Sequence, residues 1–204
     1  DGMLNASPQI PMRFQNELGA ALARQLGREV RYVQLPRTRV MGALESGEGD
    51  IQCSTLPEWL PGEVDWTRPF IPVSEVVASS PRVKPPSSLA ELRGQRFGTV
   101  LGFRYPEVDR VLGQDYIRDD APSTALSIRK WKAGRFDYLI TPRTMIEREM
   151  ALGTLPRGTH IMSIYEVKTM CAVSRKSRIS VAEFNSAIEA MEKSGELARM
   201  LKQR

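Results

Sequence analysis

Two stretches of the sequence decide the fold class: LESGEGDI at residues 44–51 and WKAGRFDY at residues 131–138. Position by position, each has an apolar helix end, a small residue, a glycine, two further residues, an aspartate and the start of a strand. The glycine permits a left-handed helix cap, and the aspartate can hydrogen-bond local amides at the strand entry. Because the two matches lie 87 residues apart in the same context, they predict two similar α/β lobes.

The first lobe is expected to alternate strands and helices. Apolar residues recur at helical spacing before Gly27, and Pro36 interrupts a later alternating stretch. Strands separated by helices indicate a parallel sheet with helical crossovers. The expected elements are a strand at 3–7, a helix over 14–26, a strand at 29–34, a short helix over 40–46 and a strand at 50–54.

A second start follows a linker at residues 79–86. Ser88 and Glu91 have the spacing of a capping box, in which the serine oxygen accepts an exposed amide hydrogen bond and the glutamate reaches back. A strand at 96–101, a helix from about Pro106, a helix through Trp131 and a strand at 137–141 complete this lobe. Beyond it we expect a strand at 166–174, a second capping box at 180–183 and a helix that is interrupted at 195.

Composition excludes several functional classes. The net charge is +5, but lysine and arginine alternate with acidic residues instead of forming a basic tract, so we expect no nucleic-acid partner. The positive excess is a mild indication of an acidic ligand. The apolar run at 73–79 is broken by Glu75, and no run reaches membrane-spanning length. No signal peptide is visible at Asp1, but a processed secreted protein and one expressed without its leader would look the same, so this observation decides nothing.

The two cysteines and the single histidine argue against catalysis and metal binding. Cys53 and Cys171 lie 118 positions apart, and two thiols cannot build a zinc site. A Ser-His-Asp or Cys-His pair would have to use His160, which lies in a turn-like stretch and is interpreted as a surface loop residue. We therefore expect no enzyme activity, no metal and no cofactor.

Five motifs in order resemble the periplasmic solute-binding proteins that include polar amino acid receptors, which have the type II periplasmic binding protein fold. The resemblance covers nearly the whole chain. The motifs are ALESGEGD at 43–50, VDWTRPF at 64–70, SLAELRG at 88–94, GRFD at 134–137 and FNSAI at 184–188.

This resemblance implies an α/β fold of two Rossmann-like lobes with a hinge that the chain crosses twice. Lobe 1 would comprise residues 1–78 and a C-terminal return at 168–204, and lobe 2 would comprise residues 79–167. A small solute would bind in the interlobe cleft, at strand ends and helix N-termini, and hinge bending would close the lobes. The protein is then expected to be periplasmic and monomeric, with a membrane permease or receptor as its partner.

The sequence departs from the amino acid receptors at two positions. The loop at 54–62 lacks the arginine that grips the α-carboxylate in that family, and the family's aspartate for the α-amino group falls at Pro142. We therefore expect a small anionic solute, such as a carboxylate without an α-amino group, instead of a standard α-amino acid. Arginine side chains near the cleft rim would bind it with paired, charge-assisted hydrogen bonds.

Candidate ligand contacts follow from strand ends and helix starts. Small hydroxyls at a strand's carboxyl end can bond a ligand without blocking it, arginines can bind an anion, and aromatic rings can stack on a ligand or pack at the hinge. For the arginines the competing interpretation is a solvated surface position. The candidates are Ser7, Arg37, Ser54, Thr55, Trp59, Phe103, Arg104, Tyr105, Thr141 and Arg143.

Three other functions stay open at this point. The same module could be the sensory domain of a membrane receptor, or a dehydratase-like enzyme with Glu58 or Glu147 as its acid. The effector domain of a transcription regulator is disfavoured because nothing before Met3 provides a DNA-binding helix-turn-helix. The family's strand order also predicts that Cys53 and Cys171 lie close together on neighbouring strands, and we favour two buried thiols over a disulfide.

Overall fold

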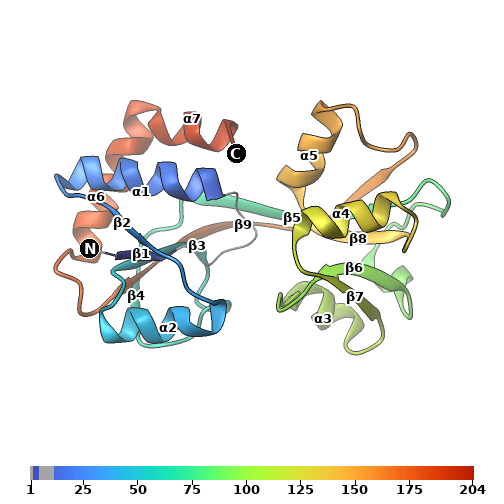
Figure 1. The fold of residues 1–204 in the computed structure, drawn as a ribbon, viewed down its shortest axis with the longest axis horizontal. Coiled ribbons are helices and arrows are strands. Elements are labelled where there is room, and N and C mark those ends of the chain that lie inside the picture. Colours follow the sequence, from blue (N-terminus) through green and yellow to red (C-terminus); the bar gives the residue numbers. More distant parts are fainter. Residues whose placement is uncertain (1, 5–11) are drawn as a thin grey trace. The chain divides into compact units, whose positions relative to one another are not determined.

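The computed structural model describes residues 2–4 and 12–204 and divides the chain into two compact units. Unit 1 comprises Asp1–Pro72 and Lys168–Arg204, and unit 2 comprises Val73–Val167. Figure 1 shows the blue N-terminal and red C-terminal segments together in unit 1. The two-lobed α/β fold expected from the paired motifs is confirmed.

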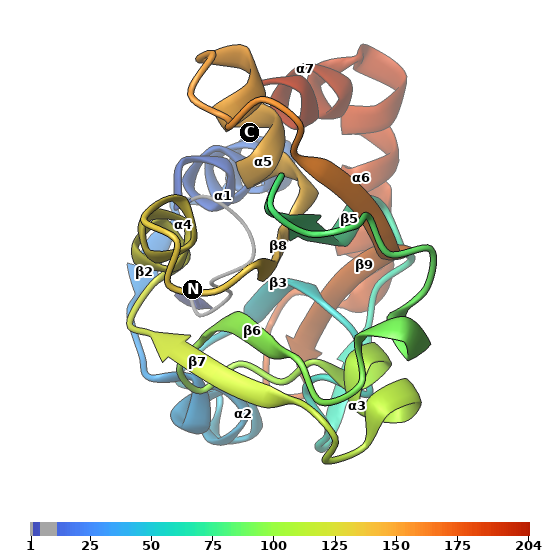
Figure 2. The same cartoon turned by 90° about the vertical axis from the view of Figure 1, so that its right-hand side faces the viewer.

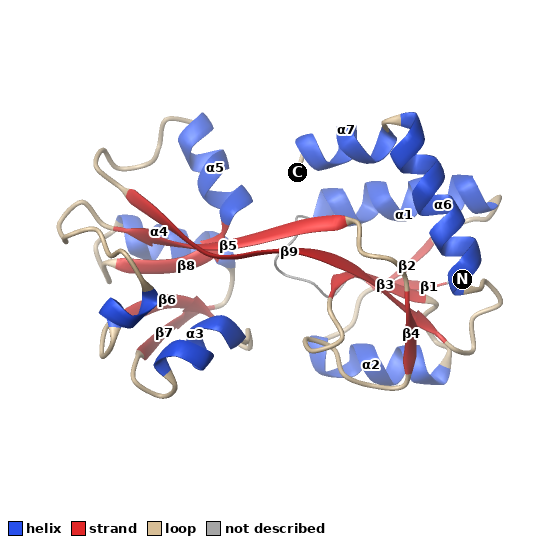
Figure 3. Cartoon of the chain, turned by 180° about the vertical axis from the view of Figure 1, so that it is seen from behind, coloured by secondary structure: helices blue, strands red, loops and turns tan. Residues whose placement is uncertain are grey.

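The sheet of unit 1 has the order β2-β1-β3-β9, with β4 paired to β9. β1 runs parallel to β2 and β3, whereas β9 is antiparallel to β3. Figure 3 shows α1, α6 and α7 on one side of this sheet and α2 on the other. The elements are β1 (Gly2–Leu4), α1 (Met12–Leu26), β2 (Arg31–Val33), α2 (Arg37–Ser46), β3 (Ile51–Thr55), β4 (Val64–Trp66), the start of β5 (Ile71–Ser79), the end of β9 (His160–Ser174), α6 (Val181–Ser194) and α7 (Glu196–Lys202).

The sheet of unit 2 has the order β5-β8-β6-β7. β6 is parallel to β7 and β8, and β5 is antiparallel to β8. Figures 1 and 2 show α3 and α4 on opposite faces of this sheet. The elements after β5 are the 3₁₀ helix η1 (Leu89–Leu92), β6 (Arg96–Val100), α3 (Pro106–Leu112), β7 (Ile117–Ala121), α4 (Thr124–Lys132), β8 (Tyr138–Pro142), α5 (Arg143–Ala151) and the first part of β9.

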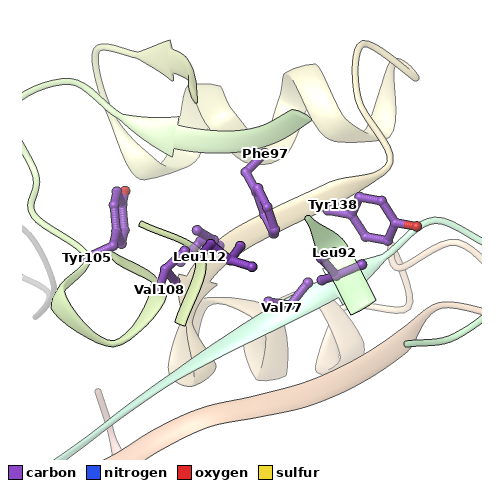
Figure 4. Packing of buried hydrophobic residues seen from close by; sticks show 8 residues of the cluster. Val77, Leu92, Phe97, Tyr105, Val108, Leu112 and Tyr138 are labelled. Carbon is purple, nitrogen blue, oxygen red and sulfur yellow. The ribbon is translucent and has the colours of Figure 1, made fainter. Parts of the chain in front are cut away.

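Alternation along β5 gives unit 2 a core on each face of its sheet. Val77 belongs to one cluster, with Phe97, Leu112 and Ile140, and Figure 4 shows side chains of this cluster packed together. Its neighbour Val76 belongs to the other cluster, on the side of α4 and α5. The period of two along a strand explains the division, because successive side chains point to opposite faces.

The paired glycines of the two lobes have the same backbone geometry. Gly47 has φ 83° and Gly134 has φ 79°, the left-handed conformation that glycine adopts without a Cβ penalty. The amide of Gly47 donates to the carbonyl of Leu44 at 3.2 Å, and that of Gly134 donates to Trp131 at 2.9 Å. Each glycine therefore ends a helix and turns the chain toward a strand.

The paired aspartates also correspond. The carbonyl of Asp50 accepts a 2.8 Å hydrogen bond from the amide of Ser174, and the carbonyl of Asp137 accepts one of 2.8 Å from Ser80. In both cases the hydroxyl of the serine accepts the amide two residues later at 3.2 Å. The two units thus share a turn that joins the start of one strand to the end of its antiparallel neighbour.

Several local expectations need correction. The first crossing between units falls at Pro72–Val73, because residues 73–79 continue β5 and pair with β8. The return at Lys168 is where the sequence placed it. His160 is the partly buried first residue of β9 instead of a loop residue. Of the expected strand at 3–7, residues 5–7 lie outside the described residues.

Only one of the two expected capping boxes forms. The Ser180 hydroxyl accepts the Glu183 amide at 3.1 Å, and the Glu183 carboxylate accepts the Ser180 amide at 2.7 Å. Ser88 makes no capping hydrogen bond, because a 3₁₀ helix follows it and Glu91 instead accepts the amide of Ser87 at 2.8 Å.

Cys53 and Cys171 form a disulfide, with their Cα atoms 3.9 Å apart. The prediction of proximity is confirmed, since β3 and β9 are neighbours. The preference for two free thiols is wrong. A register shift between Gln52 and Thr55 in β3 accompanies this close approach.

Candidate functional site

The carboxyl end of β3 presents two small hydroxyl residues in unit 1. Ser54 and Thr55 are both buried, with exposed fractions of 2% and 7%. Ser54 has φ 60°, and it is the one non-glycine residue with positive φ in the described part of the chain. No described residue hydrogen-bonds its buried hydroxyl. A strained backbone with an unsatisfied buried hydroxyl is typical of a functional position.

Arg37 and Trp59 lie beside each other in unit 1. Arg37 is the exposed first residue of α2, and its guanidinium donates to the carbonyl of Trp59 at 3.2 Å. This contact attaches the start of α2 to the loop that follows β3. Trp59 is half-buried. Ser7, the remaining unit 1 candidate, lies outside the described residues.

In unit 2 the carboxyl end of β8 continues directly into α5. Thr141 is 1% exposed, and its hydroxyl has no hydrogen-bond partner among the described residues. Arg143 is the partly buried first residue of α5. The candidates Thr141 and Arg143 therefore lie together where the strand ends.

The three candidates that follow β6 differ in exposure. Arg104 is exposed and Phe103 is half-buried. Tyr105 is 2% exposed and belongs to the core cluster of unit 2, beside Val108 in Figure 4. Of the two roles left open for this aromatic ring, stacking on a ligand or packing, its place in the core cluster agrees with packing. Its hydroxyl accepts the amide of Val100, the last residue of β6, at 2.8 Å.

Arg118 on β7 holds the turn after β6 in place. Its guanidinium donates to the carbonyls of Phe103 at 2.8 Å and Val100 at 2.9 Å, and lies 5.1 Å from the centre of the Tyr105 ring. It also pairs with Asp120 at 2.9 Å. Burial acts to raise the pKa of Asp120, but hydrogen bonds from Thr99 and Arg118 outweigh it and lower the pKa below its usual value.

Glu75 is the residue of this region that sequence reasoning missed. It is 3% exposed and lies on β5 directly opposite Pro142. No described residue forms a hydrogen bond or ion pair with it, and burial raises the pKa of its carboxyl to about 8. An acid within the apolar run at 73–79 was the available signal, since a buried charge needs a reason.

Two other kinds of feature, a metal site and a membrane-spanning helix, are absent from residues 2–4 and 12–204. No group of three or more histidine, cysteine, aspartate or glutamate side chains there could hold a metal ion. In the same ranges, no helix has the length and apolar character needed to cross a membrane.

Comparison with known families assigns the chain. The model of the bacterial extracellular solute-binding proteins, family 3, matches residues 14–203. The chain belongs to this family. The resemblance seen in the five sequence motifs is therefore confirmed, and the protein is a solute-binding protein of the type II periplasmic fold.

Relatives of this solute-binding protein bind amino acids. The arginine-binding extracellular protein ArtP of Bacillus subtilis (strain 168) is 25% identical over 195 residues, covering 93% of this chain and 76% of ArtP. The GluR0 ligand binding core in complex with L-glutamate has a TM-score of 0.80 at 14% identity, over 99% of this chain and 96% of the other. An ancestral arginine-binding protein bound to glutamine has a TM-score of 0.73 at 19% identity, over 99% and 96%.

Proposed function

We propose that this solute-binding protein captures a polar amino acid outside the cytoplasm and delivers it to an ABC importer. The observation that carries the proposal is the family match over residues 14–203, joined with buried hydroxyls that lack partners at strand ends. Ser54 supplies such a group in unit 1 and Thr141 supplies one in unit 2. Buried polar groups in proteins are normally hydrogen-bonded, so each of these hydroxyls is a candidate ligand contact within its own unit.

The ligand class proposed here departs from the anion expected from the sequence. The relatives described above bind arginine, glutamine or glutamate, so their shared feature is the amino acid itself and not a net negative charge. The anion prediction depended on a missing acidic group opposite the ligand's amine. Glu75, paired with Pro142 across β5 and β8, supplies a carboxyl at that end of the strand.

Extracytoplasmic action agrees with the cysteine chemistry. A structural disulfide such as Cys53–Cys171 persists in oxidising compartments and is rare in the cytosol. We further propose that the protein acts in the periplasm as a monomer and delivers its solute to a permease. Bending at the two chain crossings would close it on the solute.

Binding, not catalysis, is proposed because the acids considered for an enzyme are poorly placed. Glu58 and Glu147 are both exposed. A general acid must lie within hydrogen-bond reach of the substrate, and an exposed surface position does not hold a substrate in place.

The test is a thermal-shift screen of the twenty amino acids, organic acids, inorganic phosphate and neutral sugars, followed by isothermal titration calorimetry of the hits. At a ligand concentration 100 times Kd, binding adds about 2.7 kcal/mol to stability. For a chain of this size that corresponds to a rise in Tm of roughly 5–11 °C. We expect one or a few polar amino acids to give it. A response to organic acids or sugars alone would contradict the proposal.

A further inference from the structure

The position of Glu75 at the strand ends of unit 2 follows from the sheet register. Glu75 pairs with Pro142, the last residue of β8, after which α5 begins. The next pair, Val76 and Thr141, points to the opposite face. Glu75 therefore shares a face with Val77, on the side of Tyr105 and α3.

The immediate surroundings of Glu75 supply no counter-ion. Tyr105 is near enough for Glu75 to raise the pKa of its phenol, together with burial as the larger cause. Arg118 and Asp120 also act on Tyr105, but the guanidinium of Arg118 is engaged by two carbonyls and by Asp120. Among the described residues no cation is bonded to Glu75.

A buried carboxyl without a protein cation beside it is either protonated and neutral, or it is ionised and paired with a cation that a ligand supplies. Burying an unpaired carboxylate is costly, and a cation that arrives with several N–H donors removes the cost. The hydroxyl of Tyr105 accepts from the amide of Val100, which leaves its own O–H proton to orient one carboxyl oxygen or a ligand atom. The site is thus suited to a group with a positive charge.

We propose that Glu75 is the specificity-determining residue that receives the cationic side-chain group, an ammonium or a guanidinium, of the solute. The inference depends on the proposed function for the nature of the solute. A guanidinium can form two parallel hydrogen bonds with a carboxylate. When the pair forms, a carboxyl that was protonated in the free protein gives its proton to the buffer.

The test compares wild type with Glu75→Gln by calorimetry. The ligands are arginine, citrulline, whose side chain is the neutral isostere of that of arginine, and agmatine, which lacks the carboxylate of arginine. Glutamine replaces a neutral carboxyl with a neutral amide of nearly equal shape. The Tm of the Glu75→Gln variant at pH 6 checks that it folds. Glu149→Gln is the matched control, because Glu149 is a unit 2 acid already bonded to Lys132 and Thr154.

We expect Glu75→Gln to weaken arginine or agmatine binding at least about tenfold while citrulline changes less than about threefold and Glu149→Gln changes neither. If arginine and citrulline bind both proteins with unchanged affinity, the role of Glu75 is overturned and the amino acid function stands. If agmatine alone binds, and only to wild type, Glu75 keeps its role and the amino acid function fails. If no cation binds wild type, the role of Glu75 fails, and the amino acid function is decided separately by the screen of the twenty amino acids.

Discussion

The sulfur atoms of Cys53 on β3 and Cys171 on β9 are bonded, 118 positions apart in the chain. The whole of unit 2 lies in the sequence between them. The bond therefore ties the first segment of unit 1 to its C-terminal return, two pieces that would otherwise depend on packing and strand pairing alone. A cross-link over so many residues removes much of the freedom of the unfolded chain.

Replacing both cysteines by serine should lower the free energy of unfolding by about 2–5 kcal/mol. Denaturant titration of the double variant against wild type measures the change. Dithiothreitol should destabilise wild type to a similar degree and leave the double variant unaffected. Two free thiols in the denatured, unreduced wild-type protein would show that the bond is absent.

Glu75 should make stability depend on pH. An unfolded glutamate titrates near 4.5, whereas burial raises the pKa of Glu75 in the folded protein to about 8. Between these values the folded chain binds the additional proton, so its stability is greatest below about pH 4.5, falls as pH rises and levels off above about 8. Glu75→Gln should remove this contribution, which is on the order of 5 kcal/mol at most.

The measurement is the free energy of unfolding of both proteins at intervals from pH 4.5 to 9. The two curves should lie close together at the acid end, with the variant more stable at the alkaline end. Parallel curves over this range would mean that Glu75 is ionised in the folded protein and has found a partner.

The sequence predicted best where local chemistry and tertiary structure agree. The glycines at three helix ends, Gly47, Gly134 and Gly195, all have the left-handed conformation. Glycine that follows a helix commonly forms a left-handed cap, because it has no Cβ to oppose that conformation. β7 was missed since it reads Ile-Arg-Asp-Asp-Ala, with three consecutive charged residues, and lacks the alternation of a half-buried strand. It is an edge strand, stabilised by pairing with β6.

The site was harder to predict than the fold for a physical reason. The exposed Arg104 and the core residue Tyr105 are adjacent in sequence, and no pattern distinguishes them before the turn around Arg118 is known. In the sequence, Glu75 is an interruption of an apolar run. Its importance depends on burial against β8, which is a property of the assembled sheet.

The two serines expected to cap helices offer a matched pair of substitutions. Ser180→Ala should lower the free energy of unfolding by about 1 kcal/mol, since it leaves the Glu183 amide without its acceptor. Ser88→Ala should change it by no more than about 0.5 kcal/mol, because Ser88 makes no capping hydrogen bond. Equal losses in chemical denaturation would contradict the difference between α6 and η1.

Substitutions of Ser54 should affect the free energy of unfolding and the affinity for the solute in different directions. Holding a non-glycine residue at φ 60° costs on the order of 1 kcal/mol, and the buried hydroxyl has no partner among the described residues to offset its desolvation. Ser54→Gly relieves the backbone strain, although a more flexible unfolded chain cancels part of the gain. We expect the free energy of unfolding to stay level or to rise by up to about 1 kcal/mol.

Binding should change in the opposite direction. If the Ser54 hydroxyl bonds the solute, Ser54→Gly and Ser54→Ala should each raise Kd about 3- to 10-fold, the value of one hydrogen bond. Ser127→Ala is the control, because that hydroxyl in α4 is also buried and lacks a partner among the described residues. Calorimetric Kd values for the three variants decide the question. Weaker stability together with unchanged affinity in Ser54→Gly would show that the left-handed serine is a structural feature of the β3 end and not a ligand contact.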